Sequence, residues 1–110
     1  MPADAAKPTE GEPETRRDHP HDTVMWEVGA APTRLADLVA WVEAEAVPEL
    51  LRRDGCLEVA VFDSADDRAV VIAQFAGDPG QLPDPPADLL RRPPQTWPFR
   101  HLSSHRPAGR

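Results

Sequence analysis

The chain has 110 residues, of which 40% are hydrophobic and 28% are charged, a composition typical of one small globular domain with a polar extension. Its formal net charge is −7 and it has no basic run, which argues against nucleic-acid binding, since that function needs clustered Lys and Arg. A single cysteine, Cys56, excludes an intrachain disulfide, and the lack of a long apolar run indicates no signal peptide and no membrane binding, so we expect a cytoplasmic protein.

Residues 1–22 form an acidic arm that we predict to be disordered. They contain no Val, Ile, Leu or aromatic residue, so nothing in them can be buried to offset the entropy lost on ordering. Within the arm, Asp18-His19-Pro20-His21-Asp22 brings together residue types that bind metals. Because a disordered arm has no preformed ligand geometry, we expect adventitious binding of a divalent ion there and no specific metal site.

A strand and a long helix follow the arm. Over residues 23–28, Val24, Trp26 and Val28 alternate with Met25 and Glu27, and this period of two predicts a strand. From about Thr33 the chain shows one apolar helical face, made of Leu35, Leu38, Val39, Val42 and Ala46. Pro48 cannot continue the hydrogen-bond ladder, so we expect a break near Val47 and then a short helical turn. Gly55 is suited to the left-handed conformation that caps such a turn.

Two further strands are predicted as an antiparallel hairpin. Residues 57–62 alternate, with Leu57, Val59 and Val61 on one side, and residues 70–75 are nearly all apolar on both sides. Residues 64–68 between them are polar and favour a turn. Beyond the hairpin, residues 77–86 are rich in Pro and Gly.

The C-terminal part is predicted to hold one helical turn over residues 87–92 and a last strand over residues 97–102. Pro98 restricts that strand to the edge of the sheet, where a missing N–H is tolerated. Residues 103–110 are expected to form a flexible tail, which leaves residues 23–102 as the folded domain.

This order of elements predicts an α+β, ferredoxin-like fold with an antiparallel sheet, one long kinked helix and a reduced second helix. One helix covers only one face of the sheet, yet residues 70–75 present apolar side chains to both faces. A second copy packed sheet to sheet is the simplest cover for the other face, so we expect a homodimer. The alternative is that residues 79–98 fold back over that face.

The chain resembles the antibiotic biosynthesis monooxygenase (ABM) family of the dimeric α/β barrel superfamily. The resemblance covers about residues 23–77. It rests on the helix ending in Ala46-Val47-Pro48-Glu49-Leu50-Leu51, on Asp54-Gly55-Cys56, on the polar turn Asp66-Asp67-Arg68, and on the strand Val70-Val71-Ile72-Ala73-Gln74-Phe75.

The resemblance implies a homodimer whose sheets close into a barrel, with a pocket between helix and sheet. It also implies an activity like that of the cofactor-independent, quinone-forming oxygenases, on an aromatic or polyketide-like small molecule. The haem-degrading branch of the family carries Asn and His, whereas this chain has no Asn at all. We therefore expect no cofactor.

Five residues are candidates for a ligand pocket or for catalysis. Trp26, Trp41, Gln74 and Phe75 are predicted to line the pocket, where tryptophan rings could stack on an aromatic ligand. The alternative for the tryptophans is ordinary core packing, and for Gln74 it is a hydrogen bond at the barrel rim. His101 is the candidate general base, because an imidazole titrates near neutral pH; the alternative is a surface histidine.

Two functions are consistent with these residues. One is a small dimeric ABM-type oxygenase. The other is a non-catalytic dimeric binding or regulatory module, in which the acidic arm or the Pro-rich segment contacts a partner.

Overall fold

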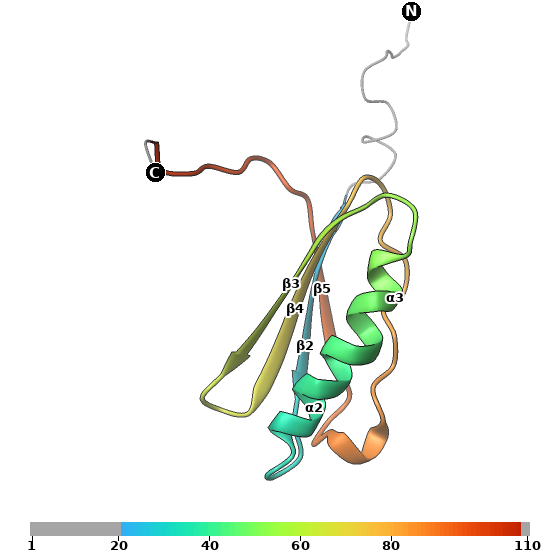
Figure 1. Ribbon diagram of the computed structural model, residues 1–110, viewed down its shortest axis with the longest axis vertical. Helices are drawn as coiled ribbons and strands as arrows, with labels where there is room; N and C mark the ends of the chain where they lie inside the picture. The colour runs from blue at the N-terminus through green and yellow to red at the C-terminus, as the bar shows by residue number, and fades with distance from the viewer. Residues whose placement is uncertain (1–20, 109–110) are drawn as a thin grey trace, which may run out of the picture.

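A computed structural model of the protein describes residues 21–108. They form a four-stranded antiparallel sheet with a helical layer against one face (Figure 1). The strands are β2 (Thr23–Gly29), β3 (Cys56–Ser64), β4 (Arg68–Phe75) and β5 (Gln95–Phe99), in the spatial order β3-β4-β2-β5. This is the strand order of a ferredoxin-like fold, so the predicted fold class is confirmed.

The helical layer is one continuous rod with an irregular middle. It consists of α2 (Leu35–Trp41), a π-helical turn η1 (Val42–Ala46) and α3 (Val47–Leu51). The predicted break near Val47 is replaced by this wider turn, which ends two residues before Pro48. A proline lacks an N–H and its ring crowds the carbonyl four residues earlier, so a π-turn at this point lets the helix continue.

The core lies between this helix and one face of the sheet. Strand residues facing the helix alternate with residues facing away, and β4 shows the alternation along its whole length. The inward side chains of the sheet and the helix are nearly inaccessible to solvent; they include Val24, Trp26, Val28, Val71, Phe75, Leu38, Val42, Ala46 and Leu50. The inward-facing side chains of the strands and the apolar face of the helix therefore pack against each other in one core layer.

The hairpin of β3 and β4 contains an irregularity that the sequence pattern hides. The pairing register shifts between Cys56 and Glu58, which leaves Leu57 as the extra residue of a β-bulge with 61% of its surface exposed. The predicted grouping of Leu57 with Val59 and Val61 on one face is therefore wrong. At the other end, Asp67 adopts a left-handed φ of 64° in the three-residue turn, a conformation that aspartate tolerates better than most residues.

The Pro-rich segment packs beside the helix. It is tied to both ends of the helical rod, by a hydrogen bond from Arg53 Nη1 to the Pro79 carbonyl (3.0 Å) and by an ion pair between Arg34 and Asp88 (3.6 Å). Leu82 and Leu89 join the core cluster from this segment, and only residues Ala87–Leu89 form a helical turn, the 3-10 helix η2. The alternative in which the segment covers the other sheet face is therefore not adopted.

That other face, here called the open face, has no helix or loop of residues 21–108 packed across its apolar part (Figure 1). Pairing registers place its apolar side chains across all four strands: Met25, Ala60, Phe62, Val70, Ile72, Trp97 and Phe99. Phe62 is 51% exposed, Phe99 49% and Trp97 39%. An apolar surface that spans a whole sheet is typical of a face that meets another molecule.

The edges of the domain differ slightly from the sequence-based boundaries. Asp22, assigned to the arm, is buried. Its backbone N–H donates to the Phe99 carbonyl (3.1 Å), and its carbonyl accepts from the Phe75 N–H (2.8 Å). The rest of the arm, residues 1–20, and most of the candidate metal motif lie outside the described residues. The last strand ends at Phe99 on the edge beside β2, where Pro98 was predicted to fit.

Candidate functional site

The predicted pocket residues Trp26 and Trp41 form an aromatic pair between sheet and helix. Trp26 lies in the middle of β2 and Trp41 is the last residue of α2, directly before the π-helical turn. Their ring centroids are 6.3 Å apart with the planes inclined by 60°, a favourable tilted geometry. Trp26 is only 2% exposed and packs in the core, whereas Trp41 is half-buried. Only Trp41 thus presents part of its ring at the surface.

Phe75 and Gln74 are neighbours in β4 and therefore point to opposite faces of the sheet. Phe75 is 2% exposed and joins the core with Trp26. Gln74 pairs with Glu58 and lines a shallow hollow of about 170 Å³ on the open face. The structure therefore places three of the four predicted pocket residues on the helix side of the sheet and Gln74 on the opposite side, although Trp26 pairs with Val71, four positions before Phe75 in β4.

His101, the candidate base, lies beyond the end of the sheet. Its backbone N–H donates to the Asp22 carboxylate (3.0 Å), and its ring Nε2 shares a hydrogen bond with Ser104 Oγ (2.7 Å). Trp26 pairs with Thr96, five positions earlier in the chain, which corresponds to roughly 17 Å of extended backbone. The structure does not place His101 beside the tryptophan pair.

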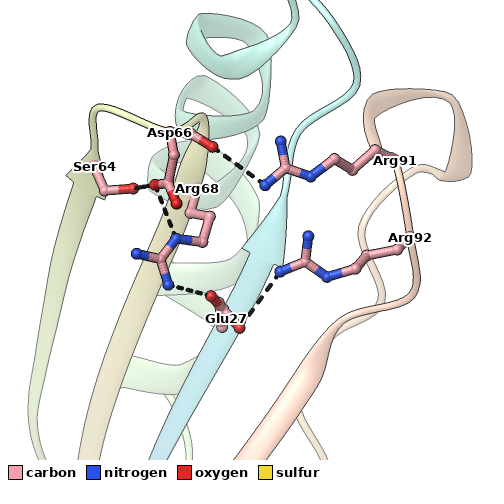
Figure 2. Close-up of polar contacts among 6 residues, drawn as sticks. All are labelled: Glu27, Ser64, Asp66, Arg68, Arg91 and Arg92. Carbon is pink, nitrogen blue, oxygen red and sulfur yellow. Dashed lines mark hydrogen bonds and ion pairs between the residues drawn. The ribbon is translucent and has the colours of Figure 1, made fainter.

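A polar cluster that the sequence analysis missed occupies one end of the open face (Figure 2). At its centre is Glu27 on β2, whose side chain is only 8% exposed and pairs with Arg68 on β4 and, at 3.5 Å, with Arg92. Arg68 also donates to Asp66 (2.9 Å), which accepts a further hydrogen bond from Ser64. We call this set, together with Arg91, the arginine cluster.

Arg91 and Arg92 reach this cluster across a glycine. The Arg91 side chain donates from Nη2 to the backbone carbonyl of Asp66 (3.2 Å). The backbone N–H of Arg91 donates to the Gly29 carbonyl (3.0 Å). A Cβ at Gly29 would come within 2.7 Å of Arg92 Nη1 and 2.8 Å of Arg91 Nε. The absence of a side chain at Gly29 is therefore what lets both guanidinium groups lie over the end of β2.

The cluster shifts the acidity of its carboxyl groups. Hydrogen bonding to Arg68 is the main reason that the pKa of Glu27 lies below its ordinary value, despite an opposing effect of burial. Hydrogen bonds from Ser64 and then from Arg68 lower the pKa of Asp66 to about 2. The pKa of Arg68 is raised, chiefly by its hydrogen bond to Glu27. All three groups are therefore held in their charged forms at neutral pH.

These lowered carboxyl pKa values predict that the cluster stabilises the fold at neutral pH and that this stabilisation is lost in acid. The unfolded chain binds the Glu27 proton near pH 4.5, whereas the folded protein does so only at lower pH, so unfolding takes up a proton in this interval. The free energy of unfolding should therefore fall as pH drops below 4.5. In Glu27→Gln, urea unfolding at several pH values should show a smaller slope of the free energy of unfolding against pH. The difference should correspond to at most about one fewer proton taken up on unfolding.

The matched control for this measurement is Glu45→Gln, which removes an exposed carboxylate of the π-helical turn, outside the cluster. It should retain the wild-type slope. Identical slopes in both variants would contradict the role assigned to Glu27.

Other types of site find no support among residues 21–108. No group of three or more His, Cys, Asp or Glu side chains there could hold a metal ion. No helix in the same range is long and apolar enough to cross a membrane. Cys56, the one cysteine, is a half-buried free thiol that packs against the core.

Several solved structures share this architecture. A monooxygenase from the gene ActVA-Orf6 of Streptomyces coelicolor, solved with the ligand nanaomycin D, matches 86% of this chain and 99% of its own, with 15% identity and a TM-score of 0.60. A proposed antibiotic biosynthesis monooxygenase of Bordetella bronchiseptica matches 74% of this chain and 96% of its own, with 24% identity and a TM-score of 0.56. Protein Rv0793 of Mycobacterium tuberculosis matches 74% and 95%, with 18% identity and a TM-score of 0.57.

The chain has the fold of the antibiotic biosynthesis monooxygenases. The resemblance inferred from the sequence is thereby confirmed at the level of the fold. No family model matches the chain, and no curated protein matches it significantly. The pocket that the ABM resemblance implies would lie between helix and sheet. In this chain Trp26 and Phe75 occupy that space, and Trp41 lies at its border.

Proposed function

We propose that the protein is a homodimeric, ABM-type oxygenase that acts on an aromatic or polyketide-like small molecule. The observation that carries this proposal is the Trp26–Trp41 pair at the junction of helix and sheet, within a fold shared with a monooxygenase solved with nanaomycin D. A tilted aromatic pair provides an apolar wall on which a planar ring can stack. The half-buried Trp41 is the member of the pair that such a ring would meet first.

The homodimeric part of the proposal is supported by the open face. Its apolar side chains extend over four strands, and the Pro-rich segment that could have covered them packs beside the helix instead. A second copy of the same sheet offers a matching apolar surface. Packing of the two open faces would remove Phe62, Trp97 and Phe99 from water.

The oxygenase reaction can be tested with an anthrone, whose oxidation by O₂ to an anthraquinone and water needs no added reductant. We would incubate the full-length protein with 1,8-dihydroxyanthrone in air-saturated buffer and follow O₂ uptake together with quinone absorbance. Turnover above the buffer rate is the expected result. Trp41→Leu should slow it by about two- to tenfold, the range expected from loss of one aromatic contact.

Leu51→Ala is the control, because it truncates an exposed apolar side chain at the end of α3, outside both the tryptophan pair and the open face. It should leave the rate within a factor of about two. Equal slowing in both variants, or no turnover above buffer, would contradict an oxygenase site at the tryptophan pair.

A non-catalytic dimeric binding module is the second candidate, and the burial of Trp26 favours it. With Trp26 and Phe75 each 2% exposed, the space between helix and sheet is filled by side chains. A filled space leaves only the half-buried Trp41 for a planar ring to contact, so the anthrone would bind there without being consumed. Quenching of tryptophan fluorescence with no O₂ uptake would support this second function over the first.

A further inference from the structure

A separate hollow lies on the C-terminal segment, and neither Trp26 nor Trp41 lines it. It has a volume of about 510 Å³, which is within the range of small-molecule sites. Its apolar wall is formed by Pro85, Ala87, Leu90, Pro93 and Pro94. Its charged lining residues are Arg91, Arg92 and Asp84. Two guanidinium groups against one carboxylate give this lining a net charge of about +1, on a protein whose net charge is −7.

The guanidinium groups of Arg91 and Arg92 carry N–H donors that no contact within residues 21–108 uses. A guanidinium carries five N–H donors. Within residues 21–108, the Arg91 side chain makes one hydrogen bond, to the Asp66 carbonyl, and Arg92 makes one ion pair, to Glu27 at 3.5 Å. Both contacts use an Nη2 atom and hold the groups in place over Gly29, so their other N–H groups remain able to bind an anion.

The hollow is also fixed before any ligand binds. Three prolines restrict φ along its wall. The segment is hydrogen-bonded to the end of β2 on both sides of Leu90, from the Ala31 N–H to the Leu89 carbonyl (2.8 Å) and from the Arg91 N–H to the Gly29 carbonyl (3.0 Å). The ion pair of Asp88 with Arg34 anchors it to the start of the helix. A preformed site loses little entropy on binding.

We propose that this hollow binds a planar, apolar monoanion, such as an aromatic carboxylate, with the ring against the prolines and Leu90 and the carboxylate on Arg91 and Arg92. The carboxylate of Asp84 disfavours a second negative group on the ligand. This site is independent of the proposed oxygenase function, because it shares no residue with the Trp26–Trp41 pair.

The test uses 2-naphthoate as the probe and 2-naphthamide as its neutral counterpart, in titrations of the ¹⁵N-labelled full-length protein followed by NMR. The naphthoate should give saturable shifts of the Leu90, Arg91 and Arg92 amides, with a dissociation constant of about 1 mM for a ligand of this size. The amide should bind about tenfold or more weakly, since it lacks the charge-assisted hydrogen bonds. Raising the NaCl concentration to about 0.5 M should weaken naphthoate binding.

Arg91→Met should abolish the saturable shifts, whereas Arg100→Met, which removes an exposed arginine outside the hollow, should leave them unchanged. The spectrum of each variant reports whether it is folded, and the salt titration tests the wild-type protein without any substitution. Shifts confined to Phe62, Ile72 and Trp97 on the open face, equal binding of both probes, or an unaffected Arg91→Met variant would each overturn the proposal.

Discussion

Replacing Phe75 with alanine is expected to lower the free energy of unfolding by about 3–5 kcal/mol. Phe75 is 2% exposed, ends β4 and packs in the same core as Trp26 and Leu50. Its removal would leave a cavity between two layers that cannot close, because the sheet pairs on both sides of β4 and the helix is tied at both ends. A loss of this size is a large part of the stability of a small domain, about 5–15 kcal/mol.

The measurement is urea unfolding followed by circular dichroism, with Phe62→Ala as the matched control. Phe62 is the same residue type on the neighbouring strand, but it lies on the open face and is 51% exposed. Both variants should be compared at one low protein concentration, because association stabilises a folded protein by mass action. If Phe62→Ala costs as much as Phe75→Ala, the assignment of the two faces is wrong.

Much of the fold could be predicted because its determinants are local. Alternation over residues 23–28 follows from the pleat of a strand, and the spacing of Leu35, Leu38 and Val42 follows from the turn of a helix. The apolar run of residues 70–75 is typical of a strand with apolar contacts on both faces. The order of these elements then leaves few topologies. Only the fine detail differed: a π-helical turn relieves the crowding at Pro48, and a bulge at Leu57 shifts one register.

The arginine cluster could not be predicted, because its partners are distant in the chain. Glu27 lies 41 positions from Arg68 in sequence, and only the pairing of β2 with β4 brings them together. Arg91 and Arg92 look like solvated surface residues until the segment after η2 folds back over Gly29. A local signal did exist for Gln74: its position next to Phe75 in a strand already placed the two side chains on opposite faces.

A charge in the middle of the open face is expected to prevent the proposed homodimer from forming. Ile72 is half-buried and lies at the centre of this face, paired with Met25 on β2 and with Ala60 on β3. In a sheet-to-sheet dimer, Ile72→Lys would put an ammonium group between two apolar layers without a partner, which is strongly unfavourable. The dissociation constant should rise by about 100-fold or more.

Light scattering after size exclusion, at several protein concentrations, measures this effect directly. The wild-type protein should have about twice the chain mass of 12.1 kDa, and Ile72→Lys should have the mass of a single chain. Ala40→Lys adds the same charge on the exposed side of α2 and should remain dimeric. A wild-type monomer, or a dimer that survives Ile72→Lys, would contradict a homodimer formed through the open face. The shared fold would then not extend to a shared mode of assembly, because the sheet pairing that gives the fold is complete within one chain.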